Sequence, residues 1–125
     1  MTQPFSNSVL AFTGDAVYSL LVRENLANSG NRPSKKLHTL ASKKVCAAAQ
    51  SKAYRHIWEY LTEDEAAVMR RGRNSHCGLP PKNTGRTEYQ EATGLECLFG
   101  WLWLTRQAER AREIFQIIDE NVQIQ

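Results

Sequence analysis

The chain has 125 residues, of which 42% are hydrophobic and 23% are charged, and its formal net charge is +3. This composition is ordinary for a soluble globular protein, and the length allows one domain with a real core but not a second. No apolar run approaches the roughly 18 residues of a membrane-spanning helix, and the N-terminus lacks the layout of a signal peptide. We therefore expect one domain over residues 1–125, in the cytoplasm.

The cysteine and histidine pattern gives little sign of disulfides or zinc. The chain has three cysteines, an odd number without CxxC spacing, which favours reduced thiols. A zinc site built from His38, His56, His76 and Cys77 is conceivable, but no paired ligand spacing supports it.

The positive charge is concentrated in two blocks. No acidic residue lies between Glu24 and Glu59, and a second acid-free stretch runs from Met69 to Thr87. A charge run is usually a solvated face, but two separate basic blocks on a small domain are typical of a surface that binds a polyanion. Their basic residues are Arg32, Lys35, Lys36, Lys43, Lys44, Lys52 and Arg55 in the first block, and Arg70, Arg71, Arg73, Lys82 and Arg86 in the second.

The first predicted helix spans about Ser8–Leu26, with Ser6 or Asn7 as its cap. Its central segment, Leu10–Val22, is apolar or aromatic almost throughout. Because a helix that is apolar on every side belongs inside a domain, we expect Asp15 to lie near the core. Burying even a neutral polar group without a partner costs about 2 to 7 kcal/mol, so this carboxylate must be compensated. The glycine before it indicates the close approach of another backbone or a ligand.

Turn residues at 28–33 separate this helix from a helical segment over Ser34–Leu61, with a candidate break near Ser42. Apolar residues recur along the second half of this segment at four-residue spacing. Thr62 then begins a capping box, and the short helix that follows ends near Arg71. The spacing predicts that three basic residues face solvent or substrate: Lys44, Lys52 and Arg55.

Residues 72–86 form a predicted loop with no helical or alternating pattern. Loops of this length in a compact domain are usually functional or disordered, and the basic residues around this one favour a function. Thr87 caps the next predicted helix, which runs to about Thr105, and a final amphipathic helix spans 108–121. Because no segment reads as a strand, we expect an all-α bundle.

Two acids stand in similar apolar settings on different predicted helices. Asp15 follows Thr-Gly, and Glu96 follows Thr-Gly-Leu as the one charge in an otherwise apolar run. The paired glycines predict that the two helices approach closely and that the carboxylates meet. Such a pair requires a cation, a shared proton or a basic side chain. A buried ion pair is one alternative, but the nearest bases in sequence, Arg23 and Arg106, are about two turns away or more. Mg²⁺, which prefers one or two carboxylates and several waters, is the other.

These motifs resemble those of the ribonuclease III family. Residues 12–17 are similar to the signature helix of its catalytic domain, and residues 94–100 are similar to its second catalytic helix. Within the family the chain most resembles the Mini-ribonuclease III subfamily, which has the catalytic domain without a double-stranded-RNA-binding domain. The resemblance covers roughly Val9–Leu104. Further similar stretches are residues 36–38, 70–74, 81–84 and 92–96.

The resemblance implies a metal-dependent endoribonuclease that cleaves double-stranded RNA. Full-length ribonuclease III has further acids where this chain has Ser8, Ala11 and Thr93, so that only Asp15 and Glu96 carry over as catalytic and metal-binding acids. The implied cofactor is Mg²⁺, with Mn²⁺ as a substitute, in a one- or two-metal arrangement. The implied RNA-binding residues are Lys36, His38, Arg70, Arg71, Arg73, Asn74 and Lys82.

The resemblance also implies a homodimer, since one active site cuts one strand of a duplex. We expect Phe99, Trp101 and Trp103 to supply its apolar surface, although each is equally compatible with an ordinary core position.

The RNA target that the resemblance implies is the precursor of large-subunit (23S) ribosomal RNA, processed in a bacterial cytoplasm or a plastid stroma. A large-subunit ribosomal protein would present it. The main alternative is a non-catalytic helical RNA-binding or ribosome-assembly protein on the same scaffold, which requires the basic blocks but not the acids. A third hypothesis, a helical interaction module, explains neither the acid-free loop nor the two glycine–acid motifs.

Overall fold

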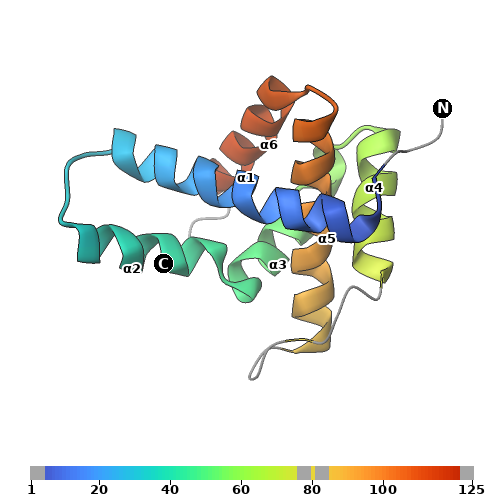
Figure 1. Ribbon diagram of the computed structural model, residues 1–125, viewed down its shortest axis with the longest axis horizontal. Coiled ribbons are helices and arrows are strands. Elements are labelled where there is room, and N and C mark those ends of the chain that lie inside the picture. The colour runs from blue at the N-terminus through green and yellow to red at the C-terminus, as the bar shows by residue number, and fades with distance from the viewer. Residues whose placement is uncertain (1–4, 76–79, 81–84, 122–125) are drawn as a thin grey trace.

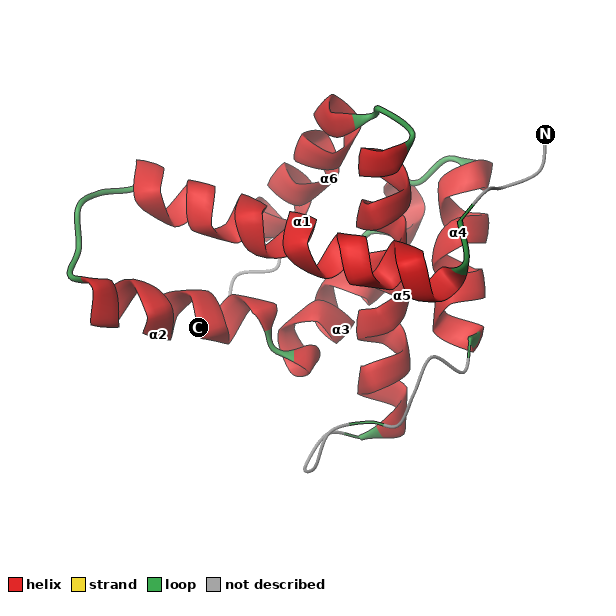
Figure 2. Cartoon of the chain, in the orientation of Figure 1, coloured by secondary structure: helices red, strands yellow, loops and turns green. Residues whose placement is uncertain are grey.

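The computed structural model describes residues 5–75, 80 and 85–121, and all regular elements in these residues are helical (Figures 1 and 2). The all-α prediction is confirmed. None of the described helices is both long and apolar enough to cross a membrane. The elements are α1 (Asn7–Asn28), α2 (Ser34–Val45), α3 (Ala47–His56), the 3₁₀ helix η1 (Trp58–Tyr60), α4 (Glu63–Asn74), α5 (Arg86–Leu104) and α6 (Ala108–Asn121).

Helix α5 is the centre of the fold. Figure 1 shows α1 crossing α5 and the other helices arranged around the pair, and α5 packs against α1, α3, α4 and α6. This position explains why the helix is apolar on nearly every side. Phe99 is fully buried and packs edge-on against Tyr18, with 5.1 Å between the ring centroids. Phe99 is therefore a core residue, and the prediction that it lies on a dimer surface is wrong, whereas Trp101 and Trp103 are half-buried.

Helix α1 begins one residue earlier than predicted and ends two residues later, and the Ser6 hydroxyl caps it by accepting from the Val9 N–H at 3.2 Å. It is not buried on every side. Val9, Phe12 and Leu20 are 44%, 82% and 50% exposed, and their spacing places them on one stripe of the helix. The even apolar pattern concealed this stripe, because an apolar residue gives no sequence signal of exposure.

The segment predicted as Ser34–Leu61 breaks at Cys46 rather than near Ser42. Cys46 has an extended backbone and separates α2 from α3. The break lets the two helices pack on different neighbours, since α2 lies along α1 and α3 packs against α5. Helix α3 then ends at His56, and η1 completes the segment.

The capping box at Thr62 is confirmed, with the Glu65 N–H donating to the Thr62 hydroxyl and the Thr62 N–H donating to the Glu65 carboxylate. Helix α4 extends to Asn74, three residues beyond the predicted end, because its last turn packs on α5. A Cβ added at Gly72 would lie 2.7 Å from the Cys97 sulfur. Helix α5 begins at Arg86, with Gly85 rather than Thr87 as its cap.

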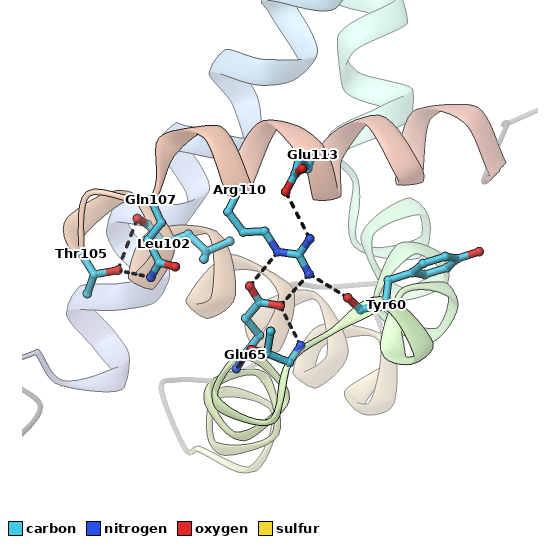
Figure 3. A network of polar contacts seen from close by, with 8 residues as sticks. Tyr60, Glu65, Leu102, Thr105, Gln107, Arg110 and Glu113 are labelled. Carbon is cyan, nitrogen blue, oxygen red and sulfur yellow. Dashed lines mark hydrogen bonds and ion pairs between the residues drawn. The ribbon is translucent and has the colours of Figure 1, made fainter.

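Arg110 joins α6 to α4 and η1 (Figure 3). Its guanidinium donates to both carboxylate oxygens of Glu65, at 2.8 and 2.9 Å, and to the Tyr60 carbonyl at 2.7 Å. It also reaches Glu113 at 3.3 Å. Burial alone would raise the pKa of Glu65, but the bonds from Arg110 and Thr62 outweigh it and hold the pKa below its usual 4.5. The pair therefore stabilises the fold at neutral pH, and its contribution is lost as the pH falls through the lowered pKa.

We predict that Arg110→Gln lowers the free energy of unfolding by about 3 kcal/mol, because it leaves the buried Glu65 carboxylate without its partner. Arg112→Gln is the matched control, since Arg112 pairs with Glu24 on the surface and such pairs contribute about 1 kcal/mol or less. Urea unfolding at pH 7 measures both variants. Equal losses in the two would show that the Arg110 pair is no stronger than a surface pair.

Candidate active site

The crossing of α1 and α5 brings the two backbones into direct contact. A Cβ added at Gly14 would lie 1.6 Å from the Glu96 carbonyl oxygen, and one added at Gly100 would lie 2.0 Å from the Leu10 carbonyl oxygen. Any side chain at either position would force the helices apart. The predicted close approach is confirmed at Gly14, but on α5 it is Gly100 and not Gly94 that makes the contact with α1. A Cβ added at Gly94 would instead lie 2.8 Å from the Met69 carbonyl oxygen of α4.

Asp15 and Glu96 meet at this crossing, close enough for the charge of Asp15 to raise the pKa of Glu96. Both line an open hollow of about 300 Å³. Glu96 is partly buried, but Asp15 is exposed, so the expectation that Asp15 lies near the core is wrong. The stretch around Asp15 is apolar because α1 carries apolar residues on two faces: one packs into the core and the other is the exposed stripe. The other residues that line the hollow are Ser8, Ala11, Phe12, Tyr89 and Thr93.

Glu96 is held in an environment that disfavours its charge. Burial raises the pKa of Glu96 to about 8, and the negative charge and hydrogen bond of Asp15 act in the same direction. The Gln50 side chain acts in the opposite direction and lowers the pKa of Glu96. The pair without a bound cation therefore keeps a proton at neutral pH.

The surroundings of the two acids favour a divalent cation as their partner over a Lys or Arg side chain. The ion pairs of the described residues lie elsewhere, and no Lys or Arg is among the groups that shift the pKa of Glu96. A cation between the carboxylates would relieve the repulsion that now requires a proton. Over residues 5–75, 80 and 85–121, no cluster of three or more His, Cys, Asp or Glu side chains could hold a metal. The two carboxylates alone therefore suit a divalent cation that keeps several of its waters.

The basic end of α4 packs on α5. Gly72 lies against Cys97, and Gly94 lies against the backbone of Met69 and Arg73, in the turn of α5 that also contains Glu96. Arg70 is stacked over the Trp58 ring at 5.5 Å, and Arg73 donates to the Asn74 side chain at 3.1 Å. Arg70, Arg71 and Asn74 are exposed, and Arg73 is half-buried. All four lie on α4, which extends over Arg73 and Asn74, two residues that were predicted to lie in the loop.

The remaining predicted RNA-binding residues lie apart from the acids or outside the described residues. Lys36 and His38 are exposed on α2, and His38 lines a hollow with Arg23 and Ala27 near the end of α1. Twelve residues separate Asp15 from Ala27, which is about 18 Å along a helix axis. Lys82 lies outside the described residues, as do His76 and Cys77 of the zinc alternative.

Two basic residues predicted to face solvent or substrate form ion pairs; Arg55 is exposed as predicted, and Lys44 is half-buried. Lys44 binds Asp119 of α6 at 3.0 Å, and Arg55 binds Glu91 of α5 at 2.9 Å. The sequence could not reveal these pairs, because the partners are 75 and 36 residues apart.

The most informative residue that sequence reasoning missed is Gln50. It is 3% exposed on α3 and is among the groups that shift the pKa of Glu96. A signal was available, since Gln50 is a long amide in the run Ala-Ala-Ala-Gln-Ser-Lys-Ala, where small residues predict close packing and leave one polar side chain to be satisfied internally.

We predict that the stability of the metal-free protein falls by roughly 1 kcal/mol per pH unit between pH 5 and 8 on account of Glu96. The folded state retains a proton there that the unfolded state releases, because the folded pKa of about 8 exceeds the usual 4.5. Glu96→Gln should remove this component. Urea unfolding in EDTA at several pH values measures it, with the exposed Glu59→Gln as the control. Parallel pH curves for the parent and Glu96→Gln would contradict the prediction.

Comparison with known proteins identifies the family. The ribonuclease III domain matches residues 8–107. The chain is 40% identical over 109 residues to Mini-ribonuclease 3 of Thermoanaerobacter sp., which covers 87% of this chain and 77% of the relative. It is 41% identical over 120 residues to Mini-ribonuclease 3 of Desulfitobacterium hafniense, covering 96% and 76%.

The fold also matches a solved structure. A crystal structure of a protein from Fusobacterium nucleatum superposes with a TM-score of 0.84 at 30% identity, over 94% of both chains. Ribonuclease III proteins act on double-stranded RNA and generally depend on a divalent metal ion. The chain belongs to the ribonuclease III family and is an endoribonuclease.

Proposed function

We propose that this endoribonuclease hydrolyses phosphodiester bonds of double-stranded RNA with Mg²⁺ at the Asp15–Glu96 pair, with Mn²⁺ able to substitute. The observation that carries the proposal is the meeting of the two carboxylates in an open hollow, with the pKa of Glu96 raised to about 8 and no basic residue among the causes of the shift. Two acids that repel each other in the free protein are suited to a divalent cation that RNA phosphates help to hold.

The roles of the two acids follow from their surroundings. Asp15, which is exposed, is accessible to ions and phosphates from solvent, while Glu96 is partly buried. Glu96 gives up its retained proton when it takes on a metal-binding role, since a ligating carboxylate must be ionised. When bound, Mg²⁺ supplies an activated water and stabilises charge on the attacking and leaving oxygens.

We predict that Asp15→Asn and Glu96→Gln each abolish Mg²⁺-dependent cleavage of duplex RNA while the helical fold remains intact, because each removes a charge and keeps the shape. A gel assay with and without Mg²⁺, together with circular dichroism, measures both effects. Near-parental cleavage by either variant would sink the assignment. A parent protein that binds duplex RNA without ever cutting it would favour the non-catalytic alternative.

We propose that the end of α4 is the main RNA contact, through Arg70, Arg71, Arg73 and Asn74. Its support is the packing of this helix end next to the acid-bearing turn of α5. A-form RNA is bound mainly through its phosphates and 2′-hydroxyls, which suits exposed guanidinium groups. Lys36 and His38 would contact the duplex further along, and Lys82 completes the proposed set.

We propose a homodimer in which the exposed stripe of α1 packs against a second copy. Phe12 is 82% exposed, which is unfavourable for a large aromatic side chain left in water. Because Phe12 also lines the hollow that contains Asp15, a second copy on this stripe would border the site. Two sites related by symmetry are what double-strand cleavage requires.

We predict that Phe12→Glu converts a dimer into a monomer at micromolar concentration, because it places a charge in the apolar contact. Sedimentation velocity of the parent and the variant measures the change. Tyr60→Glu is the control, since Tyr60 is 41% exposed on η1, away from the stripe. A parent protein that is monomeric yet cuts both strands in one binding event would refute the two-site arrangement.

The biological substrate that we propose is the precursor of large-subunit (23S) ribosomal RNA, in the cytoplasm or a plastid stroma, with a large-subunit ribosomal protein as a possible presenting partner. The support is the identity of about 40% to several Mini-ribonuclease 3 proteins. Side chains cannot read the deep major groove of A-form RNA, so selectivity would come from the shape of the RNA and from its presentation.

A further inference from the structure

One face of α5 forms a wall of the hollow that contains the two acids. Tyr89, Thr93 and Glu96 line the hollow, and because they are four and three residues apart they lie on one face of the helix. Gly100 continues the same face at the contact with α1. Figure 1 shows the first turns of α5 extending beyond its crossing with α1. Tyr89 belongs to these turns and lies about 10 Å from Glu96 along the helix axis, since it is seven residues earlier in the helix.

The Tyr89 hydroxyl differs from the neighbouring Thr93 hydroxyl in having no partner within the protein. Tyr89 is half-buried, and its backbone carbonyl accepts a hydrogen bond from the Thr93 hydroxyl at 2.9 Å. Over residues 5–75, 80 and 85–121, the phenol O–H of Tyr89 itself makes no hydrogen bond. A tyrosine at a partly buried position packs its ring and keeps its hydroxyl at the water. The Tyr89 hydroxyl is therefore available to a molecule that enters the hollow.

The chemistry of a phenol limits which part of an RNA duplex suits it. The backbone of RNA offers phosphate oxygens and ribose 2′-hydroxyls. A phosphate oxygen only accepts hydrogen bonds and is bound best by guanidinium groups, which this protein carries on α4 and not among the residues that line the hollow. A phenol both donates and accepts hydrogen bonds, and so does a 2′-hydroxyl. The Tyr89 hydroxyl therefore suits a 2′-hydroxyl better than a phosphate.

We propose that Tyr89 is a specificity-determining residue: its hydroxyl forms a hydrogen bond with a ribose 2′-hydroxyl of the RNA strand in the hollow. The inference rests on the function proposed above, because it requires that strand to be held at Asp15 and Glu96. The position of Tyr89 along α5 places the contact at a nucleotide next to the cleaved bond, not at the bond itself. Since DNA lacks the 2′-hydroxyl, the contact favours RNA over DNA at that nucleotide.

The test combines Tyr89→Phe, which removes the hydroxyl and keeps the ring, with duplex RNAs that each carry a single 2′-deoxy nucleotide. The cleavage site is first mapped on the unmodified duplex, and the 2′-deoxy nucleotide is then placed at each neighbouring position in turn. We expect Tyr89→Phe to lower kcat/KM on the unmodified duplex about 3- to 10-fold, the effect of one lost neutral hydrogen bond. One 2′-deoxy position should lower the parental kcat/KM by a similar factor. On that substrate Tyr89→Phe and the parent should be equal, because the two changes remove the same contact.

Tyr60→Phe is the matched control, because Tyr60 is 41% exposed on η1 and is not among the residues that line the hollow. It should leave kcat/KM unchanged on every duplex. The urea midpoint of Tyr89→Phe should match that of the parent, because the hydroxyl that is removed bonds to no described residue. Parental kcat/KM in Tyr89→Phe would overturn the proposal. So would an equal loss on the unmodified duplex and on every 2′-deoxy duplex, which would assign the hydroxyl to a phosphate, a second copy of the chain or the packing of α5.

The variants of the two acids separate this inference from the function on which it rests. If Asp15→Asn or Glu96→Gln cuts duplex RNA as the parent does, the function proposed for the hollow is wrong and the inference falls with it. If both variants are inactive while Tyr89→Phe keeps the parental kcat/KM, only the role of Tyr89 is wrong.

Discussion

The contact of α1 with α5 at Gly14 and Gly100 is the constraint on which the rest of the structure depends. Two helices whose backbones touch have their relative position fixed to within a fraction of an ångström, because neither can retreat without losing the core packed around the crossing. That rigidity allows two carboxylates to be held together against their repulsion. The apolar contacts around the crossing offset the free-energy cost of holding two carboxylates close together. A protein keeps such a destabilising pair where it is needed for binding rather than for stability.

Much of this arrangement could be predicted from the sequence, because its signals are local. A glycine beside an acid in an apolar helix indicates both a close approach and a buried charge, and the structure brings Asp15 and Glu96 together. The capping box at Thr62 was equally readable, since all its atoms belong to four consecutive residues. The exposure of Asp15 was not predictable, because apolar residues that face the core and apolar residues that face the surface give the same sequence pattern.

The features that could not be predicted depend on pairs far apart in the chain. In the sequence, nothing indicates which acidic residue pairs with Lys44 or with Arg55. In the structure, they pair with Asp119 and Glu91. Likewise, the capping-box Glu65 turned out to be a buried partner of Arg110, 45 residues later. Each case also lowers the number of basic groups available to a polyanion, so a count of charges along the chain overstates the basic surface that RNA could contact.

The attachment of α4 at both ends has a consequence for how its arginines meet a partner. Arg110 fixes the first turn through Glu65, and the packing of Gly72 on Cys97 fixes the last. Helix α4 is thus held at both ends, by α6 and by α5. The backbone of its arginine-bearing end is therefore ordered before any partner binds. Binding at this end therefore costs conformational entropy of the arginine side chains but little entropy of the backbone. A given number of phosphate contacts should therefore yield more affinity than the same arginines would on a flexible tail.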